Sequence, residues 1–142
     1  MNNKVFVGAS LFASEDSTPL ERLKDEGIEV QLNPYKRRLD EPETVEHLQG
    51  VTGLLAGLEP LNRRVLEQVS GTLKVIARIG IGTENIDLIA AKELGIKVSN
   101  TPEGPTRAVA EMTLGACLAL LRGLVINNEG VHRRKWPKQV SV

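Results

Sequence analysis

Short runs of β-branched and aliphatic residues alternate with segments of mixed polarity along most of the chain. Runs of this kind, bounded by glycine, proline or other turn residues, are typical of strands rather than helices. The sequence therefore predicts five strands, which cover Lys4–Ala9, Ile28–Asn33, Val51–Gly57, Leu73–Ile79 and Ile96–Asn100.

The segments between these runs carry signals for the start of a helix. Thr18 and Glu21 have the spacing of a capping box, with proline at the first helical position between them. Asp40 and Glu43 offer a weaker version of the same arrangement. Asn85 can cap a helix that begins at Ile86-Asp87. We therefore expect a helix in each of these segments.

Glycines stand where these helices end and the next strand begins. Gly27 and Gly95 can adopt the left-handed conformation that closes a helix, and Gly50 is placed in the same way. Strands and helices joined so closely favour a parallel sheet with helices on both faces. We therefore predict an α/β fold, a flavodoxin-like, doubly wound, five-stranded parallel sheet. The strand order does not follow from the sequence.

The character of the chain changes after Asn100. A proline-rich joint, TPEGP, leads into a long predicted helix from Thr106 to about Arg122 that is apolar nearly all round. A helix that covers one sheet should keep a polar face, so this helix requires a further domain or a second subunit for its burial. We expect Cys117, within it, to be a core residue rather than a nucleophile. The predicted domains are 1–101, on the substrate side, and 102–142, a hinge, interdomain helix and tail.

The composition excludes several classes of protein. The chain has 142 residues, 41% of them hydrophobic and 25% charged, as a globular domain does. Equal numbers of acidic and basic residues, 18 each, give no net field to attract nucleic acid or a membrane surface. The apolar stretch Ala108–Leu121 falls short of the ~20 residues that span a bilayer. A single cysteine and an N-terminus without a signal sequence favour the cytoplasm.

The tail Asn127–Val142 is basic, with Arg133, Arg134, Lys135 and Lys138 against Glu129 alone. We interpret it as a solvated segment that leads to a next domain. An arm that binds nucleic acid is the alternative, and neither the neutral chain nor its 3% aromatic content supports it.

The loop Ala77–Asn85 is the most informative segment for function. It leaves a predicted buried strand, turns through Gly80 and Gly82 and enters a helix, at the edge of the sheet where doubly wound folds bind ligands. Its amides can hold an anion, and Arg78 adds a cation suited to carboxylate or phosphate. A dinucleotide fingerprint, GxGxxG, fails because Asn85 stands at the third glycine position. The residues alone leave a small-anion site and a simple turn equally open.

The stretch Leu73–Arg122 closely resembles the D-2-hydroxyacid dehydrogenases, particularly the D-3-phosphoglycerate dehydrogenase branch. Three motifs carry the resemblance: R-x-G-x-G-x-[DE]-N-[IV]-D at Arg78–Asp87, N-T-P at Asn100–Pro102 and V-A-E at Val109–Glu111. A weaker resemblance extends over the preceding residues. It implies an enzyme that moves hydride between NAD and a small 2-hydroxy or 2-oxo acid.

The resemblance also implies residue roles. In that family, the backbone amides of the glycine loop bind the substrate carboxylate. This implies roles for Ile79, Gly80 and Ile81, with Arg78 near the acid or phosphate end, and makes Arg78–Gly82, Gly82 included, the substrate-binding loop.

Two further positions, and two departures, follow from the same comparison. The residues that match Ile81 and Val109 line the nicotinamide in the family. Gly57 stands where phosphoglycerate-specific members often carry a phosphate-contacting arginine, and Pro105 where many have asparagine. Both departures argue against phosphoglycerate as the specific substrate and leave the reaction class intact.

No catalytic residue and no metal ligand is predicted in this chain. The family's catalytic arginine, glutamate and histidine follow its cofactor fingerprint, and this chain stops before it. His47, in a predicted surface helix, and His132, in the tail, lack a suitably placed acid partner. We therefore expect the isolated chain to be inactive and not to bind NAD, and the parent enzyme to use NAD.

The same scaffold also serves two other functions. A stand-alone, non-enzymatic binding or interaction domain on the same scaffold is the main alternative. A phospho-receiver domain needs an acidic pair after the first strand and an aspartate at the end of the third, where Ser10 and Gly57 stand. We also expect a homodimer through the helix at 106–122, because a monomer rarely exposes so much apolar surface.

Overall fold

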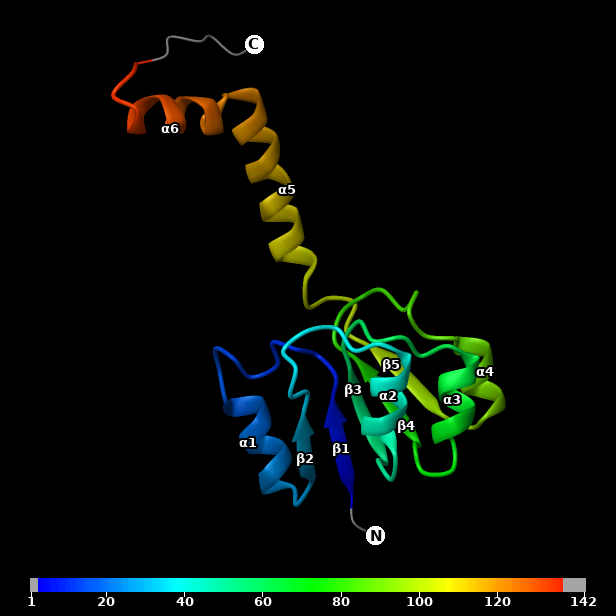
Figure 1. Cartoon of the computed structure of the whole chain (residues 1–142). Helices are drawn as coiled ribbons and strands as arrows, with labels where there is room; N and C mark the ends of the chain where they lie inside the picture. The colour runs from blue at the N-terminus through cyan, green and yellow to red at the C-terminus, as the bar shows by residue number, and fades with distance from the viewer. Residues whose placement is uncertain (1–2, 137–142) are drawn as a thin grey trace. The chain divides into compact units, whose positions relative to one another are not determined.

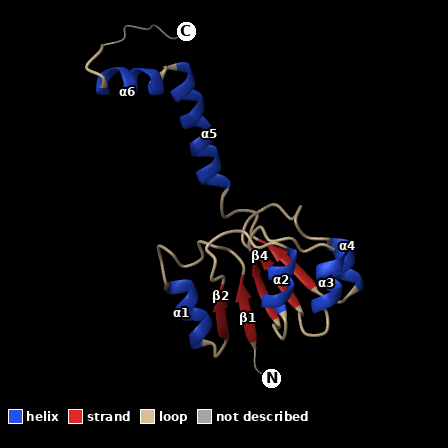
Figure 2. Cartoon of the chain, viewed as in Figure 1, coloured by secondary structure: helices blue, strands red, loops and turns tan. Residues whose placement is uncertain are grey.

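The computed structural model describes residues 3–136 and has the predicted α/β architecture (Figure 1). All five predicted strands are confirmed, each shorter than its sequence run. The strands are β1 Lys4–Val7, β2 Glu29–Leu32, β3 Gly53–Ala56, β4 Val75–Arg78 and β5 Lys97–Asn100. The helices are α1 Thr18–Asp25, α2 Glu41–Leu48, α3 Arg63–Val69, α4 Leu88–Glu93, α5 Thr106–Leu121 and α6 Leu124–His132. Strands and helices alternate through the first ten of these eleven elements (Figure 2).

The five strands form one parallel sheet in the order β2-β1-β3-β4-β5, the order of flavodoxin-like folds. The chain moves one way from β1 to β2 and the other way through β3, β4 and β5. Because crossovers between parallel strands are right-handed, α1 covers one face and α2, α3 and α4 cover the other. In agreement, α3 packs against both α2 and α4, while α1 stands apart from them (Figure 1).

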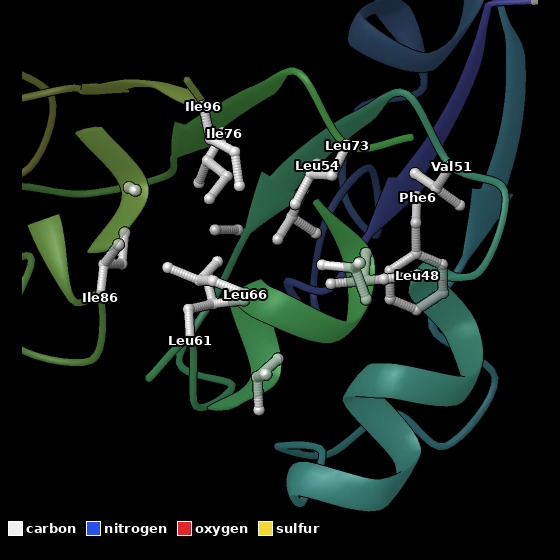
Figure 3. Close-up of a cluster of buried hydrophobic side chains, with 14 of the residues drawn as sticks. Phe6, Leu48, Val51, Leu54, Leu61, Leu66, Leu73, Ile76, Ile86 and Ile96 are labelled. Carbon is white, nitrogen blue, oxygen red and sulfur yellow. The ribbon is translucent and has the colours of Figure 1, made fainter. Parts of the chain in front are cut away.

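The core lies between the sheet and α2, α3 and α4 (Figure 3). Phe6, Leu54 and Ile76 are paired in register on neighbouring strands and are at most 1% exposed. Leu48 of α2 and Leu66 of α3 pack over them, both fully buried. This continuous apolar layer fixes the strands, and therefore fixes where their carboxyl ends meet.

Two of the predicted helix starts are wrong, and both for the same reason. Helix α1 begins at Thr18, so Ser17 is its N-cap, and the Ser17 hydroxyl donates to Glu21 instead of accepting from the backbone. Helix α4 begins at Leu88, and its N-cap is Asp87, not Asn85. In each segment neighbouring polar residues offer competing caps, and at α4 the bridge between Leu61 and Ile86 delays the start of the helix.

The start of α2 is more complete than the sequence suggested. The Asp40 side chain accepts from the Glu43 amide at 2.9 Å, and the Glu43 side chain accepts from the Asp40 amide at 3.0 Å. Arg37 donates to both Glu43 oxygens, at 2.9 and 2.6 Å. The Arg37 guanidinium holds the pKa of Glu43 at about 2, with the Asp40 amide contributing in the same direction. The Glu43 carboxylate of the capping box therefore stays ionised well below neutral pH.

The chain divides into two compact units, Met1–Pro102 and Glu103–Val142, and α5 and α6 form the second. Helix α5 confirms the predicted long helix, and none of its residues is buried. The expectation that Cys117 is a core residue is wrong, because it is a free, exposed thiol: within its own unit α5 packs only against α6.

The described part of the tail is largely exposed, as the sequence indicated, and it is helical as far as His132. Gly123 adopts the left-handed conformation, φ 56°, and the chain turns there into α6, which extends to His132. Residues 137–142 lie outside the described part of the chain. Among residues 3–136 no single helix is long and apolar enough to cross a membrane, although α5 and α6 together pass by length and composition and are bent by 64°.

We predict that Asp40→Ala destabilises the first unit by about 1 kcal/mol, the usual cost of losing an N-cap side chain. Urea denaturation followed by circular dichroism measures the change. Glu46→Ala, on the exposed surface of the same helix, is the control and should change stability by less than about 0.5 kcal/mol. Equal effects of the two substitutions would contradict the role given to the capping box.

Candidate functional site

The loops that follow β1, β3 and β4 meet at the carboxyl edge of the sheet. Because all five strands are parallel and in the order 2-1-3-4-5, these three strands are adjacent and end at the same edge. The loops surround a pocket of about 390 Å³. It is lined by Gly8, Ala9, Ser10, Leu11, Phe12, Arg38, Gly57, Leu58, Arg78 and Ile79.

The glycine loop leaves this pocket directly after Ile79. Gly80 has a φ of 129°, a backbone conformation that residues other than glycine rarely adopt. A Cβ at this position would lie 2.8 Å from Nη1 of Arg78, so the Arg78 side chain lies against the bare α-carbon of Gly80. Glycine is therefore required here both for the backbone conformation and for space beside the guanidinium.

Not all of the amides predicted to bind substrate are available. The Ile79 amide donates to the Ala56 carbonyl at 2.9 Å, and the Gly80 amide donates to the Thr101 hydroxyl at 2.7 Å. Within residues 3–136, the amides of Ile81 and Gly82 donate to no protein group. Of the predicted substrate-binding loop, the amides of Ile81 and Gly82 are therefore available as donors, and those of Ile79 and Gly80 are not.

The residues after β5 hold the glycine loop from one side. The Thr101 amide donates to the Gly80 carbonyl at 3.0 Å, in return for the bond that its hydroxyl accepts. The Asn100 side chain donates to the Ile81 carbonyl at 2.8 Å. The N-T of the N-T-P motif is thereby given a structural role: it fixes the conformation of the glycine loop.

The residues after β3 hold the same loop from the other side. The Asn85 side chain donates to the Glu59 carbonyl at 2.7 Å, while the Leu61 amide donates to the Asn85 carbonyl at 2.8 Å. Leu61 and Ile86 form an isolated parallel bridge. This bridge keeps Ile86 extended, which explains why α4 begins later than predicted and why Asn85 does not cap it.

Glu59 is the buried charge of this edge, with 1% of its surface exposed. Both carboxylate oxygens accept from the Gly57 amide, at 3.1 and 3.0 Å, and the α-carbon of Gly8 packs so closely that a Cβ there has no room. Burial raises the pKa of the Glu59 carboxyl, and the backbone amides, together with the charges of Arg78 and Arg38, act in the opposite direction. Glu59 therefore links the ends of β1 and β3 beneath the pocket.

Arg78, at the end of β4, is the arginine that the sequence predicted. Its side chain is partly buried, and its Nε is buried without a hydrogen-bond partner in the described part of the chain. A buried donor without a partner is unfavourable, so the guanidinium is suited to bind an anion and donate hydrogen bonds to it.

Sequence reasoning missed two charged residues of this site, Arg38 and Glu59. A glutamate between two apolar segments, as in GLLAGLEPL, is the only local indication that Glu59 is buried. For Arg38 there is no local indication, since its loop reaches the pocket only through the strand order.

The remaining predicted residues are not among those that line the pocket. Ile81 is 55% exposed in the first unit and Val109 is 60% exposed in the second, so their joint role at a nicotinamide stays a prediction. His47 is not the surface residue expected, because its ring is half-buried and stacks on Phe6 at 5.1 Å. His132 hydrogen-bonds only to the Asn128 carbonyl of its own helix. Among residues 3–136, no group of side chains could hold a metal ion.

Comparison with known proteins gives a consistent result. Residues 10–135 match the family described as D-isomer specific 2-hydroxyacid dehydrogenase, catalytic domain. The chain is 36% identical to the D-3-phosphoglycerate dehydrogenase of Haemophilus influenzae over 149 residues, and 36% identical to the putative D-3-phosphoglycerate dehydrogenase of Schizosaccharomyces pombe over 141 residues. These alignments cover 99% and 92% of this chain but only 35% and 30% of the relatives.

A solved structure shows the same likeness. The NAD⁺-bound 3-phosphoglycerate dehydrogenase of Entamoeba histolytica superposes with a TM-score of 0.74 at 25% identity. The match covers 86% of this chain and 40% of that protein. This chain therefore spans about a third of the length of these curated relatives and less than half of the solved structure.

We predict that Glu59→Gln removes one component of the pH dependence of stability. Because the folded protein raises the pKa of Glu59 above its ordinary value of 4.5, the free energy of unfolding falls as the pH rises from about 4.5 through the raised pKa. A neutral glutamine does not titrate. The stability of the variant relative to the native chain should therefore rise over that range.

Urea denaturation at a series of pH values measures this difference. Glu46→Gln, on the exposed face of α2, serves as the matched control and should give a flat difference. A flat difference for Glu59→Gln as well would mean that Glu59 is not buried as the structure has it.

Proposed function

This chain belongs to the D-isomer specific 2-hydroxyacid dehydrogenase family, and we propose that it is the substrate-side part of an oxidoreductase that moves hydride between NAD and a D-2-hydroxyacid. Residues 1–101 form the domain that binds the acid, and residues 102–142 lead toward a cofactor domain. The substrate is a small 2-hydroxy or 2-oxo acid. Its carboxylate binds at the Arg78–Gly82 loop.

The observation that carries this proposal is that, among residues 3–136, the amides of Ile81 and Gly82 and the buried Nε of Arg78 have no hydrogen-bond partner. Ile81 and Gly82 supply two backbone donors, and Arg78 supplies a fixed positive charge with an unpaired buried Nε. A carboxylate accepts such bonds at both oxygens, and charge-assisted bonds of this kind are the strong ones. The loop is held by Thr101 and Asn85 before any ligand arrives, so binding requires little ordering.

The loop does not fit a dinucleotide. In a dinucleotide fingerprint the third glycine allows the following helix to pack closely on the strand. Here Asn85 occupies that position, its side chain bonds to the β3–α3 loop, and α4 begins only at Leu88. We therefore expect this chain alone not to bind NAD, and in the whole enzyme only Ile81 and Val109 are assigned to the nicotinamide.

Acid–base groups are not assigned within this chain. The residues that line the pocket include neither a histidine nor a carboxylate, and Glu59 is covered beneath it. The pocket residues thus bind and orient the acid, and the proton is handled by groups that this chain does not supply. We expect the chain alone to be inactive.

We further propose that the protein is a homodimer through α5. One side of this helix forms a shallow apolar groove that includes Met112, Ala116 and Leu120. Met112 is 72% and Leu120 is 81% exposed, and exposure on this scale is unusual for a monomer. A second copy of α5 matches the groove in length and chemistry, and alanines along it permit close approach of two helices.

We predict that Gly80→Val lowers kcat/KM by roughly one to two decades in the active enzyme that contains this chain, which corresponds to the loss of ~1.5–3 kcal/mol from a charge-assisted bond. The added side chain cannot adopt a φ of 129° without strain and displaces Arg78. Gly71→Val is the control, because Gly71 has open space around it and no such φ. A folded Gly80→Val enzyme with normal kinetics would exclude the glycine loop as the acid site.

We predict a dimer for the 142-residue chain in sedimentation equilibrium at micromolar concentration. Met112→Glu places a charge in the groove and should give a monomer. Leu114→Glu adds the same charge at a residue that is 66% exposed and does not line the groove, and it should leave the dimer intact. A native chain that sediments as a monomer with its helical circular dichroism unchanged would refute dimerisation through α5.

A further inference from the structure

We propose that Arg38 binds a second anionic group of the substrate, so that this site selects D-2-hydroxyacids with an acid group at each end. The inference rests on the proposed function, because it assigns the far end of a substrate whose carboxylate is held at Arg78–Gly82. It names a specificity residue that the sequence motifs do not contain.

Arg38 reaches the pocket from a different loop than Arg78. It lies between β2 and α2, and the two arginines line the same pocket at the carboxyl edge of the sheet. Gly57 at the end of β3 lines the pocket without a side chain, so this strand end contributes no charge to it. The loop between β2 and α2 instead supplies the positive charge of Arg38.

The backbone on both sides of Arg38 is fixed. Asn33, which is 8% exposed, donates to the Gly8 carbonyl at 3.0 Å and to the Arg37 carbonyl at 2.8 Å. Leu39, on the other side, is 1% exposed and belongs to the core. The α-carbon of Arg38 is therefore held in place at the pocket, although its side chain is exposed.

Arg37 and Arg38 differ in the partners of their side chains. The Arg37 guanidinium is bonded to both oxygens of Glu43 and lies 4.8 Å from the centre of the Tyr35 ring. The Arg38 side chain has no ion pair or hydrogen bond within the described range, 3–136. The structural arginine of this loop is thus Arg37, and Arg38 is free to bind a ligand.

The charges around the pocket favour an anion. The positive charges of Arg78 and Arg38, which line the pocket, both act on the buried carboxylate of Glu59. Two cations against one anion leave an excess of positive charge, and no carboxylate lines the pocket itself. A guanidinium binds carboxylate and phosphate in the same bidentate manner, so both chemistries fit.

The test is a titration of the ¹⁵N-labelled 142-residue chain, followed by the amide resonances of Ile81 and Gly82. The probes are D-lactate, with one anionic group, and D-malate and D-3-phosphoglycerate, each with two, at constant ionic strength. We expect at least one of the two-anion probes to bind about tenfold more tightly than D-lactate. Tighter binding of D-malate indicates that the second group is a carboxylate, and tighter binding of D-3-phosphoglycerate indicates a phosphate. Tighter binding of both indicates that Arg38 binds either group.

Matched variants isolate Arg38. Arg38→Gln should remove the gain and leave D-lactate binding unchanged, whereas Lys36→Gln removes the same charge from the same loop and should alter neither. Equal binding of all three probes, or an equal loss for all three in Arg38→Gln, would overturn the role of Arg38 alone. If no probe shifts the Ile81 and Gly82 resonances, the proposed function itself fails.

Discussion

The glycine loop after β4 is held from two sides by hydrogen bonds to loops that are remote in sequence, and the proposed site depends on this restraint. Thr101 and Asn100 hold it from β5, and Asn85 and Leu61 hold it from β3. The Gly80 amide donates to one of these partners, whereas the amides of Ile81 and Gly82 have no hydrogen-bond partner among residues 3–136. The loop therefore keeps its donors exposed without having to reorganise, which is the usual requirement for an anion site built from backbone amides.

Glu59 shows that this edge is shaped for more than stability. Burying a carboxylate is costly, and its raised pKa reflects that cost. In return it binds the Gly57 amide and fills the space between Gly8 and Gly57, whose lack of side chains lets the ends of β1 and β3 approach. The charges of Arg78 and Arg38 lower its pKa against the effect of burial. A buried charge at a ligand-binding edge is consistent with a functional rather than a purely structural constraint.

The sequence predicted the strands and the fold class, because hydrophobic runs and helix-ending glycines are local signals. It also located the glycine loop and Arg78. It misplaced the starts of α1 and α4, where adjacent polar residues can each cap a helix and only tertiary contacts choose between them. It missed Arg38 and Glu59 because their proximity to Arg78 results from the strand order 2-1-3-4-5, which no local pattern encodes. It misjudged Cys117 because the apolar surface of α5 is left uncovered by this chain.

The central claim is that this chain supplies the acid-binding part of a dehydrogenase site and does not bind NAD by itself. Isothermal titration calorimetry of the 142-residue chain, with D-2-hydroxyacids in one series and NAD in another, tests both parts together. The account predicts weak but saturable binding of the acids and no saturable heat with NAD at millimolar concentration. Micromolar binding of NAD, or NAD binding without any acid binding, would contradict it.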